Sequence, residues 1–183
     1  MQYSVTQHKS CFISAGHSMT DPGAVSDGLT EAEVVLDLRD RLYRYLLVRG
    51  AMVSRDGKGG QNLPLSKAIP MARAVDLAIE LHCNAAENPR ATGVETLQNP
   101  EHRPFGRKIC DALAEAMQIR NRGPKGESSG QHSRLGFISK GGGIIVELFF
   151  LSNPDDRDAY FSNKEKVVKA LGDCILLEIT SEY

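Results

Sequence analysis

Short apolar runs alternate along the chain with longer stretches in which apolar residues recur at helical spacing. The runs are too short for helices and are typical of buried strands; they lie at residues 11–14, 51–54, 77–81, 93–97 and 144–146. Residues 135–138 are also compatible with a strand. Strands that alternate with helices indicate a mostly parallel sheet with helices on both faces. We therefore expect an α/β fold.

Capping residues mark where several helices begin. Thr30 and Glu33 form a capping box at the head of a helix that Gly50 ends. Pro70 fits the first turn of a second helix, because its missing N–H is not needed there. An apolar stripe predicts a further helix at residues 105–117.

The C-terminal part of the chain is expected to be helical as well. Asn153 followed by Pro154 is typical of a helix start. Residues 162–165 read as another capping box, and the apolar face of the last helix follows at residues 167–175. Before this region, the polar and glycine-rich segment 121–130 predicts a loop.

Length and composition suit a single soluble domain. The 183 residues allow one full-sized core, and without a visible linker or repeat we expect one domain over residues 1–183. A net charge of -1 gives no sign of a nucleic-acid partner. No apolar stretch is long enough for a signal peptide or a membrane span. The cysteines suit neither a disulfide scaffold nor a zinc knuckle, and we interpret them as mostly buried thiols: Cys11, Cys83, Cys110 and Cys174.

Three ionisable residues stand at the ends of predicted strands. His17 follows the first strand, His82 the third and Glu147 the central one. Ligands of such sheets bind beyond the carboxyl ends of the strands, so we expect these side chains to converge on one edge. Glu31 lies in the first turn of a helix, which favours an ionised carboxylate.

These residue types are those of a catalytic zinc site. Such a site needs three protein ligands and an open position for water, which His17, Glu31 and His82 would provide. A carboxylate that is not a ligand would act as general base, and Glu147 is placed for that role. A histidine at a strand end is also compatible with a structural role, so spacing alone leaves both interpretations open.

Four ordered segments carry a more specific signal. They comprise Ala15-Gly16-His17 with Asp21-Pro22-Gly23-Ala24 and Gly28-Leu29-Thr30-Glu31, then Leu81-His82-Cys83-Asn84-Ala85, then Gly93-Val94-Glu95-Thr96, and finally Ile145-Val146-Glu147 with residues 150–156. Together they resemble the motifs of the zinc N-acetylmuramoyl-L-alanine amidases of the amidase-3 type. The resemblance runs from about residue 11 to the C-terminus, nearly the whole chain.

The resemblance implies a fold, a reaction and a set of roles. The fold would be a three-layer α/β sandwich around a twisted, mostly parallel sheet. The reaction would be hydrolysis of the amide between N-acetylmuramic acid and L-alanine in bacterial peptidoglycan. One zinc ion per chain would be held by His17, Glu31 and His82. Glu147 would be the catalytic glutamate, which takes a proton from the attacking water and passes it to the leaving amine.

The chain departs from the family pattern at three places. Ser18-Met19 replaces a glycine pair after the first histidine, which alters the loop beside the metal but not a ligand. Cys83 stands where small or polar residues are more familiar; side chains alternate along a strand, so we expect it to pack away from His82. Phe149 replaces a glycine, which would reshape the substrate groove.

Other polar residues receive more general interpretations. Glu95 either lines the groove or is structural, and Asn84 is expected to orient the loop beside His82. Arg122 and Lys125 are candidates to meet carboxylates of the peptide stem, although a solvated loop is the simpler interpretation. Surface or hydrogen-bonding roles are expected of the remaining histidines, and helix-start roles of the acidic pair: His8, His102, His132, Asp155 and Asp156.

Two other functions fit the same fold. One is a non-catalytic wall-binding or regulatory domain, which the complete set of ligands and catalytic glutamate disfavours. The other is a metal peptidase that cuts within the stem. We expect peptidoglycan as substrate, a monomer, no nucleic-acid partner and no membrane insertion.

The expected setting is host-cell lysis by a phage endolysin. The catalytic domain takes up the chain, with no separate wall-binding domain and no export signal. Such an enzyme would stay in the host cytoplasm until its release to the cell wall. The alternative is an exported bacterial amidase for cell separation or wall remodelling, placed in the periplasm or outside the cell.

Overall fold

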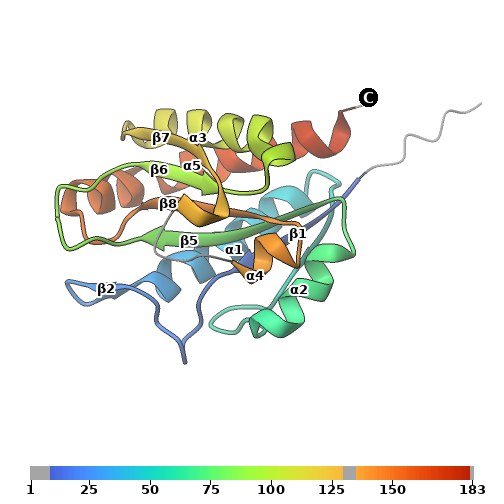
Figure 1. Cartoon of the computed structure of the whole chain (residues 1–183), viewed down its shortest axis with the longest axis horizontal. Helices are drawn as coiled ribbons and strands as arrows, with labels where there is room; N and C mark the ends of the chain where they lie inside the picture. Colours follow the sequence, from blue (N-terminus) through green and yellow to red (C-terminus); the bar gives the residue numbers. More distant parts are fainter. Residues whose placement is uncertain (1–8, 130–134, 182–183) are drawn as a thin grey trace, which may run out of the picture.

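A six-stranded sheet forms the centre of the computed structural model, which describes residues 9–129 and 135–181 (Figure 1). The first four strands in spatial order are parallel, whereas β6 runs antiparallel to β8 and β7 is parallel to β6. The expected twisted, mostly parallel sheet is therefore confirmed. The strand order across the sheet is β4 (Met52–Arg55), β1 (Ser10–Ala15), β5 (Leu77–Asn84), β8 (Ile144–Phe150), β6 (Val94–Leu97) and β7 (Asn121–Lys125).

Helices cover both faces of this sheet, but unequally. The larger core packs beneath three long helices, whereas the smaller core packs beneath two short ones. The long helices are α1 (Glu31–Leu47), α3 (Arg103–Met117) and α5 (Pro154–Thr180); the short ones are α2 (Leu65–Arg73) and α4 (Gly136–Ser139). Short additional elements are β2 (Val25–Ser26), β3 (Leu29–Thr30), η1 (Pro100–His102) and η2 (Glu127–Ser129).

Strand alternation separates an apolar face from a face that turns polar. Leu81 and Cys83 of β5 point into the larger core, whereas Ala78 belongs to the smaller one. Further along β5, the positions that share a face with Ala78 are Glu80 and His82. The short helices thus cover only the apolar beginning of this face and leave its polar end as the wall of a pocket.

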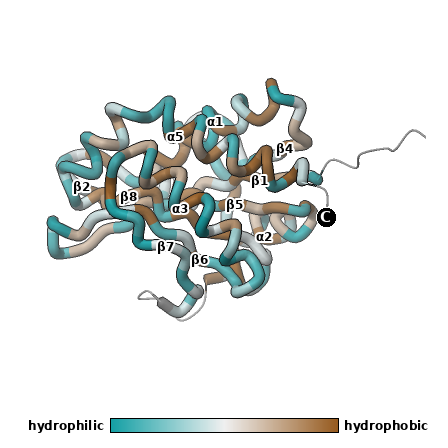
Figure 2. The backbone as a smooth tube through the Cα atoms, turned by 90° about the horizontal axis from the view of Figure 1, so that it is seen from above, coloured by the Kyte–Doolittle hydropathy of each residue, from teal (hydrophilic) through white to brown (hydrophobic). Residues whose placement is uncertain are grey.

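Hydropathy along the backbone follows the same division. Figure 2 shows the central strands β1 and β8 in the colours of apolar residues and most outer loops in those of polar residues. Among the described residues, no helix combines the length and the apolar character that a membrane crossing requires.

The predicted helix ends that depend on capping are confirmed. Thr30 accepts from the Glu33 backbone N–H while the Glu33 side chain accepts from the Thr30 N–H, which completes the capping box of α1. Gly50 follows the helix with a positive φ of 80°. Asn153 accepts from the first turn of α5, as its sequence position indicated.

Four local predictions were wrong. Helix α2 begins before Pro70, at residue 65, so the proline lies inside a short helix. In place of a strand at residues 135–138, Leu135 is the N-cap of helix α4, and the loop expected at 121–130 begins with the edge strand β7. In place of a capped start at residue 162, α5 continues across a single non-helical residue, Asn163.

A buried arginine joins α1 to the loop after β4. The Arg39 side chain is fully buried and donates to Asp56 at 3.1 Å and to the Gln61 carbonyl at 2.8 Å. Asp56 in turn accepts from the Ser14 hydroxyl and the Ala15 N–H at the end of β1. One ion pair therefore fixes three segments that meet behind the pocket.

We predict that Arg39→Met destabilises the protein strongly. The substitution leaves Asp56 buried without its charge partner, which costs about 3–5 kcal/mol. Urea unfolding of both proteins measures the difference in free energy. Arg44→Met, an exposed position on the same helix, is the control and should change stability by less than about 0.5 kcal/mol. Equal stability of the two variants would contradict this role for the buried pair.

Candidate metal centre and active site

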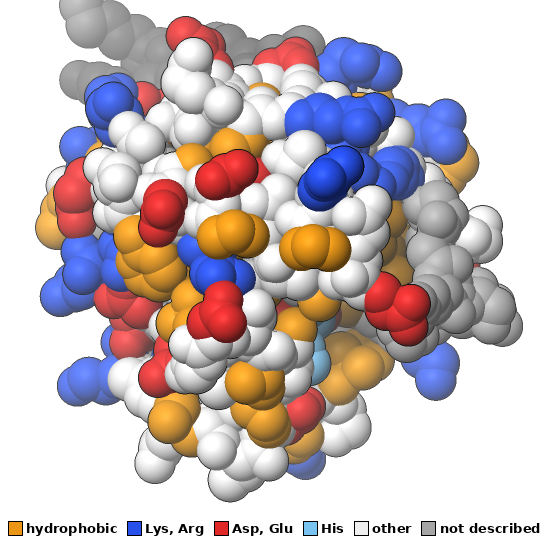
Figure 3. All heavy atoms as spheres, turned by 90° about the vertical axis from the view of Figure 1, so that its left-hand side faces the viewer, with side chains coloured by type: hydrophobic (Ala, Val, Ile, Leu, Met, Phe, Trp, Pro, Cys, Tyr) orange, Lys and Arg blue, Asp and Glu red, His pale blue; other side chains and the backbone are white. Residues whose placement is uncertain are grey.

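A pocket of about 650 Å³ opens over the polar end of the sheet. Figure 3 shows one side of the molecule, on which histidine atoms are visible inside a hollow. The loops after β1 and β5, helix α1, strands β6 to β8 and helix α4 all contribute to the lining. The charged lining residues are predominantly acidic, and they lie near two histidines.

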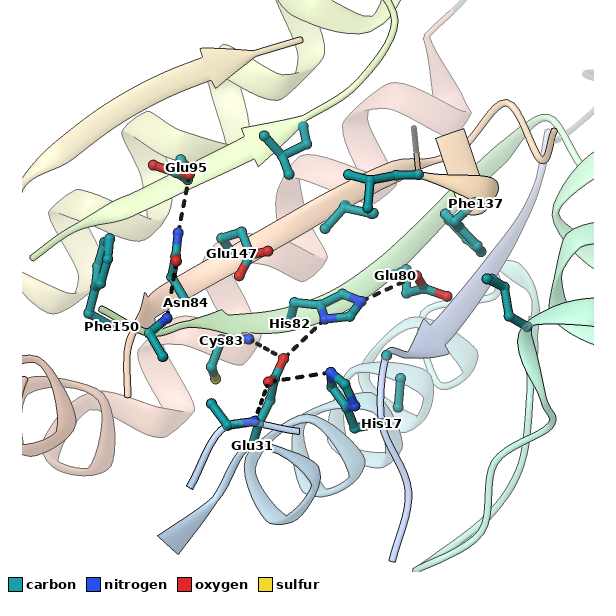
Figure 4. A pocket seen from close by; sticks show the side chains of 18 of the residues that line it. His17, Glu31, Glu80, His82, Cys83, Asn84, Glu95, Phe137, Glu147 and Phe150 are labelled. Carbon is teal, nitrogen blue, oxygen red and sulfur yellow. Dashed lines mark hydrogen bonds and ion pairs between the residues drawn. The ribbon is translucent and has the colours of Figure 1, made fainter. Parts of the chain in front are cut away.

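Three of the predicted site residues come together in this pocket. One ligand atom from each of His17, Glu31 and His82 lies within 4.8 Å of the others. His17 Nε2 is 3.4 Å from Glu31 Oε2, and His82 Nδ1 is 3.0 Å from Glu31 Oε1 (Figure 4). The residues come from the loop after β1, the first turn of α1 and strand β5. The expected convergence of distant segments therefore occurs.

Glu31 is held in the ionised form that a metal ligand needs. Its carboxylate accepts from the backbone N–H groups of Ala24 at 3.0 Å and Cys83 at 2.9 Å. Burial, the largest single influence, would raise the pKa of Glu31, but His82 and these two N–H groups together hold it below its usual value. The start of α1 adds a favourable helix dipole.

Each histidine has a second carboxylate on the side away from Glu31. His82 Nε2 forms a hydrogen bond with Glu80 at 3.2 Å, whereas His17 Nδ1 lies 3.2 Å from Asp21 without a hydrogen bond among the described residues. Carboxylates behind metal-binding imidazoles orient the rings and increase their basicity. Glu80 was missed in the sequence, although its spacing of two residues from His82 on a strand places both on one face.

Two glycines of the first motif make room for the charged cluster. A Cβ on Gly16 would lie 2.0 Å from the His82 ring. A Cβ on Gly23 would lie 2.6 Å from a Glu31 carboxylate oxygen, and its φ of +66° is one that other residues rarely adopt. The loop can therefore pass this close to the histidines and Glu31 only without side chains at these positions.

Glu147 lies beside this cluster on the neighbouring strand. It is the register partner of His82 between β5 and β8, and its Oε2 atom is buried without a hydrogen-bond partner among the described residues. Burial raises the pKa of Glu147 to about 7, although His82 opposes this increase. Both histidines and both glutamates of the predicted site therefore face one cavity. His82 and Glu147 lie within their strands and not at the strand ends.

A second charged group occupies the other side of the pocket. Glu95 on β6 is buried and pairs with Arg122 and with Lys125, the latter at 2.6 Å. The expectation of a solvated loop for these two cations was wrong, because they belong to β7 and line the cavity. Asn84 donates to Glu95 and accepts from the following N–H, which shapes the loop as expected.

The remaining predicted residues lie away from the pocket or in its framework. Cys83 is buried in the larger core, as expected, and His102 lies in η1 outside the cavity. His8 and His132 lie outside the described residues. Asp156 has a role that was not foreseen: besides standing in the first turn of α5, it accepts from the Gly93 and Phe150 N–H groups and the Thr92 hydroxyl.

Comparison with known proteins identifies the family. The family model of N-acetylmuramoyl-L-alanine amidase, amidase-3, matches residues 11–179. The chain belongs to the amidase-3 family. A solved structure assigned to an N-acetylmuramoyl-L-alanine amidase from Neisseria meningitidis shares 37% sequence identity, with a TM-score of 0.86 over 95% of this chain and 97% of that one. The resemblance seen in the sequence motifs and the expected enzyme class are both confirmed.

Two further relatives come from different settings. This chain is 28% identical to the N-acetylmuramoyl-L-alanine amidase LytC of Bacillus subtilis. The matched region covers 88% of this chain but only 34% of LytC. The catalytic domain of the CD27L endolysin, which targets Clostridium difficile, is 25% identical, with a TM-score of 0.76 over 96% of this chain and all of that one. The fold thus serves in both a bacterial amidase and an endolysin.

Proposed function

We propose that this amidase-3 chain is a zinc hydrolase that cuts the amide between N-acetylmuramic acid and L-alanine in peptidoglycan. His17, Glu31 and His82 bind one zinc ion, and Glu147 is the catalytic glutamate. The observation that carries the proposal is the meeting of these three ligand groups, within 4.8 Å, beside a buried carboxylate without a partner.

The donor set fits zinc by its chemistry. Two imidazoles and one carboxylate are ligand types of catalytic zinc sites, which leave a position open toward the substrate. Glu80 bonds to the far nitrogen of the His82 ring, as outer carboxylates do in such sites, and Asp21 lies 3.2 Å from the far nitrogen of His17. A bound zinc ion would supply a Lewis acid that polarises the scissile carbonyl and makes water a stronger nucleophile.

Glu147 performs the proton transfers of the proposed reaction. Its free Oε2 atom accepts a proton from the attacking water, whose oxygen bonds to the carbonyl carbon. As the C–N bond breaks, Glu147 passes that proton to the leaving nitrogen of L-alanine. Burial raises the pKa of Glu147, which makes its carboxylate a stronger base toward the water.

The products of digestion test this function against the alternatives. Purified peptidoglycan is incubated with the protein, with and without a chelator, and the released fragments are analysed by mass spectrometry. An amidase releases intact stems that begin with L-alanine and carry no sugar. Fragments cut within the stem would indicate a peptidase, and the absence of any release would favour a non-catalytic wall-binding domain.

We predict that each proposed ligand is needed for zinc binding. His17→Ala and His82→Ala remove one donor each, so both should lower the zinc content measured by elemental analysis and abolish activity. Added zinc should also raise the melting temperature of the wild-type protein, because it binds the folded state, and should do so much less in the variants. His102→Ala, outside the pocket, is the control. Full zinc content in both ligand variants would refute the assignment.

We predict that Glu147→Gln and Glu31→Gln fail for different reasons. Glu147→Gln keeps the shape but removes the base, so zinc content should stay near normal while activity falls on the order of a hundredfold or more. Glu31→Gln weakens a charged ligand and should lose zinc. Metal analysis paired with the turbidity of purified cell walls measures both effects. If Glu147→Gln lost its zinc while Glu31→Gln retained it, the two assignments would have to be reversed, with Glu147 as the ligand and Glu31 as the base.

We further propose that the biological setting is phage lysis, with the protein held in the host cytoplasm as a monomer until its release to the wall. An exported bacterial amidase of the periplasm or cell exterior is the alternative, and the likeness to both a bacterial amidase and an endolysin catalytic domain is compatible with either. The genes that flank the coding sequence test this: neighbouring phage lysis genes would support the proposal, and a bacterial cell-division context would contradict it.

A further inference from the structure

We propose that Arg122 and Lys125 form a subsite for a free carboxylate on the peptide stem, at the second residue from the scissile amide. This cationic pair lies in the same pocket as the candidate metal centre, across Glu147 and Glu95. The inference rests on the proposed function and adds which group of the substrate the chain recognises.

Charge in the pocket makes the pair distinctive. Apart from the proposed metal ligand Glu31, three glutamates line the cavity and would repel an anionic stem: Glu80, Glu95 and Glu147. Among the described lining residues, Arg122 and Lys125 are the lysine and arginine side chains. Although burial opposes it, these two cations hold the pKa of Glu95 below its usual value, so Glu95 is ionised at neutral pH. Two positive charges therefore share one negative charge, which leaves an excess of one positive charge.

The pair also keeps donors available for a ligand. Arg122 Nε and Lys125 Nζ both donate to Glu95 Oε2, and Arg122 Nη1 makes a long contact of 3.4 Å with the Thr92 carbonyl. Arg122 Nη2 has no hydrogen-bond partner among the described residues, and a lysine ammonium has three hydrogens. Both side chains are about a quarter exposed, at 26% and 27%, so their polar heads are accessible from the cavity.

Sheet geometry sets the reach of the subsite. Glu95 is the register partner of Glu147 on the adjacent strand, and β7 lies one strand further. Neighbouring strands are about 4.8 Å apart, so the cations lie roughly 5–10 Å from Glu147. An extended peptide advances about 3.3–3.6 Å per residue, which places the second residue of the stem within this distance.

The aromatic ring beside the cations suits a peptide as well. The Arg122 guanidinium lies 4.8 Å from the centre of the Phe150 ring, which also lines the pocket. This contact favours the position of the guanidinium beside the ring, and the ring offers an apolar surface for an adjacent aliphatic segment. A purely structural role for the pair, as an anchor of edge strand β7 to Glu95, would affect all substrates equally.

Two synthetic substrates separate these roles. Both are N-acetylmuramoyl peptides, and they differ only in whether the second stem residue carries a free carboxylate or the corresponding carboxamide. We expect the zinc-loaded wild-type protein to favour the acid by about tenfold or more in kcat/KM, mainly through KM, since a charge-assisted hydrogen bond is lost with the amide.

Substitutions then assign the preference to the pair. Arg122→Gln and Lys125→Gln should each bring the acid-to-amide ratio several-fold closer to one, and each leaves Glu95 with one cationic partner. Glu95→Gln leaves both cations without their shared anion and should keep or increase the ratio. Arg120→Gln, an exposed position just before β7, is the matched control and should keep the wild-type ratio.

The outcomes distinguish this proposal from the proposed function. Cleavage of both substrates with equal kcat/KM in the wild type would overturn the subsite and leave the amidase function intact. A wild-type preference that persists in both cation variants would also overturn it. Cleavage of neither substrate by the zinc-loaded protein would refute the proposed function, and the subsite with it.

Discussion

The site depends on the contacts that the Glu31 carboxylate makes. Its oxygens lie beside the imidazoles of His17 and His82. They also accept hydrogen bonds from the backbone N–H groups of Ala24 and Cys83. These contacts join the loop after β1, the start of α1 and the end of β5 at one point. Each of those segments is held elsewhere by apolar packing, so the position of the carboxylate is fixed by the core and not by the loop alone.

The sheet can support a charged pocket because its two faces differ. One face packs against three long helices, and this packing stabilises the fold. The other face is apolar only where α2 and α4 cover it, and beyond them β5 and β8 carry Glu80, His82 and Glu147. Glu80 has partners further back, because it accepts from Ser14, which also contacts the Asp56 that pairs with Arg39, and His82 bonds to Glu80. Glu147 keeps a buried carboxylate oxygen without a partner among the described residues.

The sequence predicted correctly those helix starts that depend on hydrogen bonds between residues close together in the chain. The capping box at Thr30 and the start at Asn153 depend on neighbouring residues, so the sequence was sufficient. The ordered motifs likewise identified the residues that the pocket brings together. Glu80 was missed because its spacing from His82 indicates a shared strand face but not which group on that face the carboxylate would contact.

Other elements depend on partners distant in sequence. Strand β7 contains Gly123 and Pro124, which locally favour a loop, and it forms because β6 offers a free edge for pairing. As an edge strand it tolerates a proline, since one side needs no ladder hydrogen bonds. The pairing of β7 with β6 brings Arg122 and Lys125 into the pocket. The spacing of residues in the sequence does not indicate this pairing.

The proposed metal ligands and the groups that face the substrate come from different stretches of the chain. His17, Glu31 and His82 lie in the first half of the sequence, on or beside the parallel strands β1 and β5, whereas the remaining pocket residues of β6, β7 and β8 lie in the second half. Mutations in β6 and β7 therefore alter one wall of the pocket without replacing a proposed metal ligand or the proposed catalytic Glu147 of β8. Exchange of the segment from β6 to β7 between relatives can thus change what the pocket recognises while the proposed metal ligands and Glu147 stay unchanged.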